Sequence, residues 1–123
     1  MTSEIGGQVS KLDVAANKVV QAVPVAVPNA KPKGVLLSRD QHTLYVSTGG
    51  GNAIAVVDAD TLAPKTVIPV GKRVWGLALS RDGTRLYACN GLDGTVSVID
   101  TTTHQVSATI QVGTRPWGLV IDD

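Results

Sequence analysis

The sequence contains no phenylalanine, one methionine and one cysteine, and aromatic residues make up 3% of its 123 residues. A single cysteine excludes an internal disulfide and any metal cluster built on cysteine. No stretch approaches the ~20 apolar residues that a membrane-spanning helix needs. The first seven residues lack the basic start and apolar run of a secretory signal. The net charge of +1 gives no electrostatic reason to expect a nucleic acid as partner.

Apolar residues nevertheless make up 43% of the chain, which is enough for a packed core in a single domain of this length. Val, Ile and Thr recur throughout, and these β-branched residues favour strands. No segment shows a sustained 3.6-residue apolar period with helix caps, so we expect no helix of consequence.

The sequence repeats itself every 42 residues. Gly34, Leu37 and Ser38-Arg39-Asp40 recur as Gly76, Leu79 and Ser80-Arg81-Asp82. A second step of 42 carries the segment 73–77 onto 115–119, and the segment 9–13 resembles 96–100 at an offset of 87, which is two periods plus three residues. A fixed period of this length is typical of proteins built from repeated structural units.

Each period predicts four short strands separated by turns rich in Asp and Gly. In the second full period we expect strands over residues 75–79, 85–89, 95–99 and 106–112. Strands such as Ala53–Val57 and Gly34–Leu37 are apolar on both faces, so each needs a neighbour above and below its sheet. This favours an all-β fold of β-propeller blades, each of four antiparallel strands, over a single sandwich or barrel of eight to eleven strands.

Four spaced signatures resemble the YVTN-type β-propeller repeat: residues 80–87, 95–100, 110–113 and 115–120. The Tyr-Val of that family stands here as Tyr45-Val46 and, with a departure, as Tyr87-Ala88. Lys33 replaces the tryptophan found at Trp75 and Trp117. The resemblance implies a propeller, often seven-bladed, in bacterial periplasmic or cell-surface proteins. It also implies kinship with quinoprotein dehydrogenase propellers and propeller lactonases.

The repeat divides the chain into two complete blades with a partial blade at each end. We expect the end of one blade over residues 1–29, blades over 30–71 and 72–113, and a first or closing strand over 114–123. Closed propellers use at least about four blades. We therefore expect the chain to be the C-terminal segment of a larger propeller. The alternative is a ring assembled from several copies, although a second strand would then be missing at each junction. Uncovered apolar blade faces predict that the isolated chain self-associates or is marginally stable.

Few residues suit catalysis, and we assign no catalytic residue. Five aspartates hold repeated turn positions where capping explains them: Asp13, Asp40, Asp58, Asp82 and Asp100. The other acids form no acid–base pair. His42 and His104 stand in different turns without a third ligand, so we expect no metal site. Cys89 falls inside an expected strand and is predicted to be packed rather than reactive.

One set of residues remains as a candidate binding site. Lys31, Arg73 and Arg115 stand 42 residues apart, each just before an expected innermost strand, and Trp75 and Trp117 follow two residues later. Equivalent positions of successive blades lie on a ring about the propeller axis. The cations would therefore favour an anionic ligand there, such as a carboxylate or a quinone cofactor. The alternative is that each basic residue pairs with a neighbouring blade's loop and each tryptophan packs between blades.

Two functional hypotheses follow. The first is a non-catalytic binding or interaction scaffold without a cofactor of its own. Its partners would be the remaining blades of a larger propeller or other copies of the chain, with a protein or a small anion as ligand and no nucleic acid. The second is a segment of a quinoprotein-like dehydrogenase subunit or of a lactonase-like propeller enzyme whose catalytic residues lie elsewhere. The family resemblance places either protein in the periplasm or at the cell surface.

Overall fold

The computed structural model describes residues 1–122, which form eleven strands in three antiparallel sheets and no helix. The strands are β1 (Thr2–Ser3), β2 (Gln8–Asp13), β3 (Lys18–Pro24), β4 (Pro32–Leu37), β5 (Thr43–Thr48), β6 (Ala53–Asp58), β7 (Pro64–Pro69), β8 (Val74–Leu79), β9 (Arg85–Asn90), β10 (Thr95–Asp100) and β11 (Gln105–Gln111). The last four match the strands expected for the second period to within one residue at either end. The all-β prediction is confirmed.

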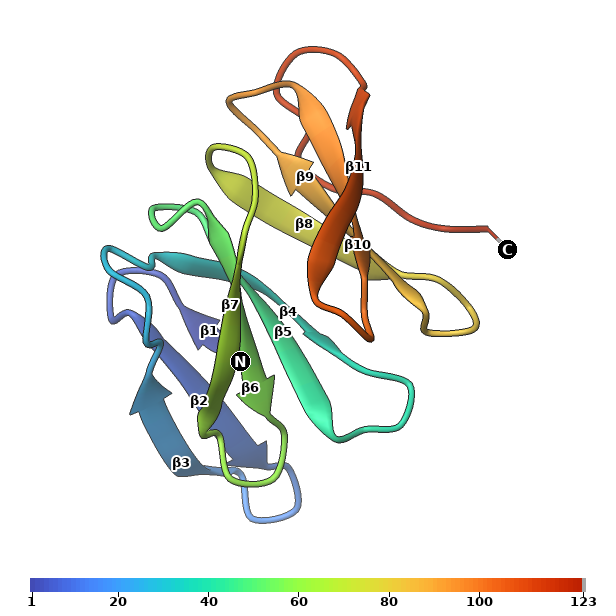
Figure 1. Cartoon of the computed structure of the whole chain (residues 1–123). Helices are drawn as coiled ribbons and strands as arrows, with labels where there is room; N and C mark the ends of the chain where they lie inside the picture. The colour runs from blue at the N-terminus through green and yellow to red at the C-terminus, as the bar shows by residue number, and fades with distance from the viewer. Residues whose placement is uncertain (123) are drawn as a thin grey trace.

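Each sheet is a simple antiparallel meander. The order is β4-β5-β6-β7 in one four-stranded sheet, β8-β9-β10-β11 in the other, and β1-β2-β3 in the three-stranded sheet. The three sheets pack in succession along the chain (Figure 1). This is the arrangement of neighbouring propeller blades.

The middle sheet is covered on both faces, because successive side chains of a strand point to opposite sides. Ile54 and Val56 of β6 join a buried cluster toward the β8–β11 sheet. Ala55 and Val57 of the same strand join a second cluster toward the β1–β3 sheet. The prediction that this strand is buried on both faces is therefore confirmed.

The strand β4 departs from that prediction. Val35 and Leu37 remain exposed, whereas Leu79, which holds the position of Leu37 one period later, is buried. The physical reason is that the β4–β7 sheet covers Leu79, while no innermost strand covers Leu37 from the side of the β1–β3 sheet. An apolar sequence is buried only where a neighbour is present to bury it.

The 42-residue period is also visible in the backbone. Non-glycine residues with a left-handed φ recur at matching positions, among them Lys31, Arg73 and Arg115 (φ 44°, 59° and 54°), and Leu62 and His104 (φ 59° and 55°). Residues other than glycine adopt this left-handed conformation uncommonly. The repeat therefore specifies the shape of the turns as well as the strands.

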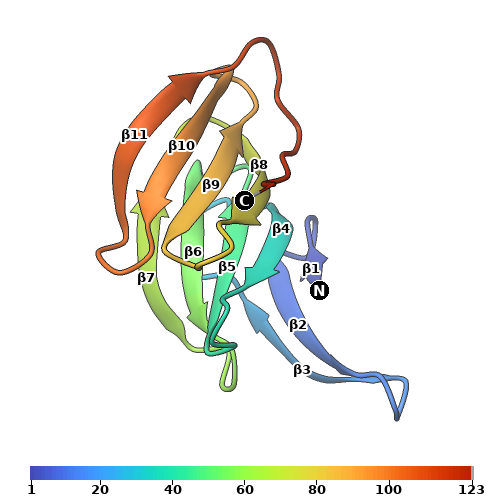
Figure 2. The same ribbon diagram turned by 90° about the vertical axis from the view of Figure 1, so that its right-hand side faces the viewer.

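The two ends of the chain differ from the expected strand pattern. Thr2–Ser3 forms a short β1 beside β2, at the position that the second strand holds in the complete sheets. Residues 112–122 contain no strand, although a strand was expected over 114–123, of which Asp123 lies outside the described residues. The amides of Val112 and Gly113 still donate to the Gly94 carbonyl, at 3.0 and 3.2 Å. Residues 114–122 then pass beside β8 (Figure 2) and pair with no strand. Without a second strand to pair with, an extended segment does not form a ladder.

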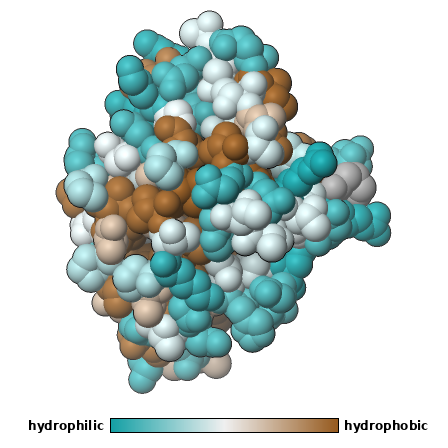
Figure 3. Space-filling model, in the orientation of Figure 1, coloured by the Kyte–Doolittle hydropathy of each residue, from teal (hydrophilic) through white to brown (hydrophobic). Residues whose placement is uncertain are grey.

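Apolar side chains remain on the surface of the three-sheet stack. Figure 3 shows them gathered from the left edge to the centre of this face, with polar side chains on the right. The exposed apolar residues include Val106 and Ile110 of β11 and Leu12, Val19 and Val20 of β2 and β3. The outermost sheets therefore keep apolar surface that the middle sheet has buried.

Candidate functional site

The meander places two kinds of connection at opposite ends of the sheets. One end collects the loops 4–7, 49–52 and 91–94 with the connections that lead into β4 and β8. We call it the basic end, because it carries five cations, Lys31, Lys33, Lys72, Arg73 and Arg115, and the carboxylates of Glu4 and Asp93. The other end, which we call the turn end, carries Asp13, Asp40, Asp58, Asp60, Asp82 and Asp100.

The five repeated aspartates at the turn end, Asp13, Asp40, Asp58, Asp82 and Asp100, accept local hydrogen bonds. The Asp58 carboxylate accepts from the backbone N–H of Thr61 at 2.9 Å and from its hydroxyl at 2.9 Å. These bonds lower the pKa of Asp58 to about 2. The hydroxyl of Ser80, followed by the amide of Thr84, likewise lowers the pKa of Asp82 to about 2. These groups cap turns, which agrees with the sequence interpretation of the repeated aspartates.

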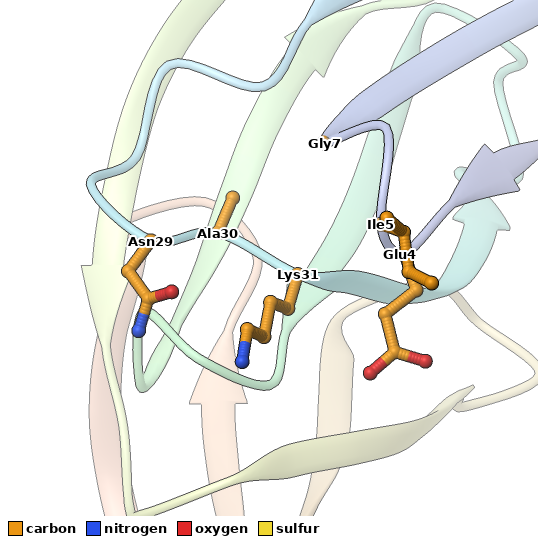
Figure 4. Close-up of a pocket in the computed structure, with 6 residues that line it drawn as sticks. All are labelled: Glu4, Ile5, Gly7, Asn29, Ala30 and Lys31. Atoms are coloured by element: carbon orange, nitrogen blue, oxygen red, sulfur yellow. The ribbon is translucent and has the colours of Figure 1, made fainter.

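The basic end holds a hollow of about 190 Å³, which we call the basic hollow. Lys31 and Arg73, which come from successive repeats, both line it, together with Lys33, Trp75 and Glu4. A second hollow of about 450 Å³ adjoins it and shares Glu4 and Lys31. Figure 4 shows Lys31 from the segment before β4, and Glu4 from the β1–β2 loop, beside this second hollow.

Three cations and one carboxylate set the charge of the basic hollow. Lys33 forms an ion pair with Glu4, and this hydrogen bond, with smaller contributions from the nearby charges of Lys31 and Arg73, lowers the pKa of Glu4. Within residues 1–122, Lys31 and Arg73 have no ion-pair partner. The positive charge of these two side chains is thus not matched by a paired carboxylate, and an anion entering the hollow would meet it.

Backbone hydrogen bonds hold the two loops that carry Lys31 and Arg73. The carbonyl of Lys31 accepts from the amide of Gly49 at 3.1 Å, and the carbonyl of Arg73 accepts from the amide of Gly91 at 3.0 Å, one period later. The Arg73 amide also donates to the Asn52 side chain at 2.9 Å. Each loop before an innermost strand is therefore tied to the loop after the second strand of the same sheet.

The two tryptophans pack against each other at this end. Trp75 and Trp117 stack with ring centroids 4.1 Å apart and an interplanar angle of 26°, and the Arg73 guanidinium lies 5.6 Å from the Trp75 ring. Trp75 is 8% exposed and Trp117 is 68% exposed. The buried indole N–H of Trp75 has no hydrogen-bond partner among the described residues. Arg115 does not line the basic hollow with Lys31 and Arg73.

The remaining candidate residues lie apart from this site. His42 and His104 stand in the β4–β5 and β10–β11 loops at the turn end. In the described part of the chain, His, Cys, Asp and Glu nowhere gather in a group of three or more that could hold a metal ion. Cys89 is buried in β9, as predicted, and burial raises the pKa of its thiol.

Sequence reasoning did not assign Glu4 or Lys33 to the site. Lys33 was visible as the one residue that replaces a tryptophan of the repeat, and that substitution was the available signal. Glu4 gave none, because it lies 29 residues before Lys33 and only the packing of the first two sheets brings their charges together.

Comparison with known proteins supports the fold. No protein-family model matches the sequence, and no curated protein matches it. Among solved structures, the chain is similar to hydrazine synthase from Kuenenia stuttgartiensis, with 33% identity over 74% of this chain and 26% of that one, at a TM-score of 0.71. A streptogramin B lyase matches 99% of this chain and 41% of its own at 17% identity and a TM-score of 0.82. The dihydro-heme d1 dehydrogenase NirN matches 93% of this chain and 26% of its own at 18% identity and a TM-score of 0.71.

These neighbours are β-propeller proteins, so the three sheets are blades of a β-propeller fold. The chain spans about a quarter to two fifths of the length of the structures named here. The described residues contain no helix that is long and apolar enough to cross a membrane.

Proposed function

We propose that the chain is a non-catalytic section of a YVTN-type β-propeller that binds a small anion at its basic end. The single observation that carries this proposal is that Lys31 and Arg73, one period apart in sequence, line one hollow without an ion-pair partner in residues 1–122. A carboxylate would fit this charge, and Trp75 offers an apolar wall. Further blades, from a longer protein or from other copies, complete the propeller in this proposal.

The carboxylates of this section support a scaffold role over an enzymatic one. The five repeated aspartates of the turn end are occupied by capping bonds, and Glu4 at the basic end is paired with Lys33. General acid–base catalysis needs a group whose proton affinity is poised near the working pH. The shifts of Glu4, Asp58 and Asp82 all run the other way, toward a permanently charged carboxylate.

Fluorescence of the two tryptophans tests the proposal, because Trp75 lines the basic hollow and Trp117 stacks on it. The probe is succinate, titrated against sodium chloride of equal ionic strength. We expect a saturable change with succinate that the double variant Lys31→Gln/Arg73→Gln loses. The matched control Lys11→Gln/Lys18→Gln removes two charges from β2 and β3 and retains the response. A change that is equal in succinate and chloride, or equal in both double variants, would refute the anion site.

The second candidate is a section of a propeller enzyme, and the similarity to hydrazine synthase and to a streptogramin B lyase favours it. In that case the chain's blades support catalytic residues that lie outside residues 1–122. A longer protein containing these blades would then be active with an added quinone cofactor or toward lactones. Absence of both activities, with succinate binding retained, would favour the scaffold.

The family resemblance also supports a periplasmic or cell-surface location as part of this proposal. Cell fractionation of the host that carries the gene tests it. Recovery of the protein only with the cytosolic fraction would contradict it.

A further inference from the structure

The segment 115–118 occupies the place of the next blade's innermost strand. A Cβ built on Gly34 would lie 2.8 Å from the Trp75 carbonyl oxygen of the following sheet, and a Cβ on Gly76 would lie 2.6 Å from the carbonyl oxygen of Trp117. The two contacts are one period apart. Arg115 repeats the left-handed φ of Arg73, and Trp117 stacks on Trp75. The segment therefore continues the contacts between sheets that the first two blades make, yet it pairs with no second strand.

At the other end of the stack, residues 1–122 supply no innermost strand. The β1–β3 sheet begins at β1, which corresponds to a second strand, and no strand lies beyond it in the described residues. A hollow of about 350 Å³ lies there, lined by Met1, Leu12, Val35 and Leu37 among others. Leu37 is 43% exposed, whereas Leu79 at the same position of the repeat is 7% exposed.

The two ends are complementary in side-chain direction as well as in strand content. Leu36 packs toward the sheet that follows it, and Val120 holds the position of Leu36 two periods later. Val120 is 89% exposed. Placed as an innermost strand beside β1, the segment would direct Val120 toward the exposed Val35 and Leu37. An uncovered apolar side chain at one end thus matches an uncovered apolar surface at the other.

We propose that a second copy of this chain supplies this innermost strand: residues 115–122 of one copy pair with β1 of its partner and complete the partner's first blade. The structure removes the main objection from sequence, which was the lack of a second strand at such a junction, because β1 supplies part of one. Transferring the β8–β9 pairing by the repeat offsets predicts that Pro116 lies opposite the partner's Ser3 and Leu119 opposite the partner's Met1.

Closure follows from the blade count. Each copy contributes two complete four-stranded sheets, three strands of one junction blade and one strand of the other. Two copies joined at both junctions form a ring of six blades, which lies within the range of about four to eight for closed propellers. The inference goes beyond the proposed function because it names the source of the missing strand.

The variant Gly118→Ala tests the junction without disturbing the single chain. A Cβ on Gly118 meets nothing within 4 Å in the structure. In the proposed dimer it faces the partner's Lys33 carbonyl, as Gly34 and Gly76 face the carbonyls of Trp75 and Trp117, so the added methyl group has no room there. We expect sedimentation equilibrium to give twice the 12.7 kDa chain mass for the wild type, and an association at least about tenfold weaker for Gly118→Ala. The matched control Thr114→Ala, in the exposed connection before the segment, associates like the wild type.

A disulfide between copies tests the register. Directly opposed residues of antiparallel strands lie about 4.5–5.5 Å apart at Cα, within the range that a disulfide spans. In a Cys89→Ser background, Ser3→Cys/Pro116→Cys is expected to oxidise to a covalent dimer, and Ser3→Cys/Thr103→Cys is not. The proposal is overturned by a monomeric wild type, by larger oligomers in place of the dimer, by unchanged association of a folded Gly118→Ala chain, or by a disulfide confined to single chains.

Discussion

The two complete blades share one repeat but differ in how much of it is buried. Ile68 of β7 and Ile110 of β11 hold the same position, yet Ile68 is 2% exposed and Ile110 is 47% exposed. The β4–β7 blade lies between two others, whereas the β8–β11 blade has a neighbour on one face and only the segment 115–118 on the other. The same residue type at equivalent positions of two strands thus contributes differently to stability, because burial depends on the next blade and not on the repeat itself.

The largest expected difference in stability comes from truncating each isoleucine to alanine. Ile68→Ala removes a buried side chain from the cluster between the sheets and is expected to cost about 2–5 kcal/mol of unfolding free energy. Ile110→Ala is expected to cost less than about 1 kcal/mol of unfolding free energy when the protein is dilute enough not to self-associate. Urea unfolding followed by circular dichroism measures both. Equal losses would mean that Ile110 is covered in solution.

A second pair of variants compares the glycines after the second strands. A Cβ on Gly91 would lie 2.5 Å from the Trp75 ring, whereas a Cβ on Gly49 would meet its neighbours at 3.5 Å or more. We expect Gly91→Ala to cost about 1–3 kcal/mol through overpacking and to shift the tryptophan emission, and Gly49→Ala to be close to neutral. Thermal unfolding and fluorescence spectra decide it, and a neutral Gly91→Ala would show that Trp75 is free to move.

A third pair compares one hydrogen-bonding position. Ser47 is buried, accepts from the Gly34 amide at 2.7 Å and donates to the Trp75 carbonyl at 2.6 Å, while Cys89 takes its place one period later. Ser47→Ala leaves both backbone groups unpaired and is expected to cost about 1–2 kcal/mol. Cys89→Ser, at the face that lacks a complete neighbouring blade, is expected to change stability by less than about 0.5 kcal/mol. Chemical unfolding of the two variants side by side is the measurement, and a larger loss for Cys89→Ser would contradict the comparison.

The smallest expected effect is a loss of stability at low pH that arises from the aspartates of the turn end. The pKa values of Asp58 and Asp82 fall from 3.8 to about 2 in the folded chain. A lowered folded pKa means that the stabilisation is present above about pH 4 and is lost as the pH falls toward 2. Melting temperatures between pH 7 and pH 2 should therefore drop mainly in that window. Asp82→Asn is expected to flatten the drop, and Asp122→Asn, in the terminal segment, to leave it unchanged; identical profiles for all three proteins would rule this cause out.

Local chemistry explains why the strands and turns of the complete blades were predictable. The aspartate turn at Ser80–Thr84 and the apolar strand Ala53–Val57 carry short-range signals that act within a few residues. The same signals predict a first or closing strand over 114–123, and residues 114–122 form no ladder because a ladder also needs a partner strand. The predicted burial of Leu37 was wrong for a related reason. Its apolar character predicts burial, but within residues 1–122 no innermost strand covers it.

The candidate site was predictable only in part. The spacing of Lys31, Arg73 and Arg115 placed them at one end, and the structure brings the first two into one hollow without the third. Glu4 entered the site through packing between sheets, which no local pattern reveals.

The sequence alone determined the 42-residue unit and its four strands separated by turns rich in Asp and Gly, because these depend on side chains within one unit. Only the tertiary structure decided which copy of each residue is buried and which cations share a hollow. These depend on the neighbouring blade, and two units of the same sequence do not have the same neighbours.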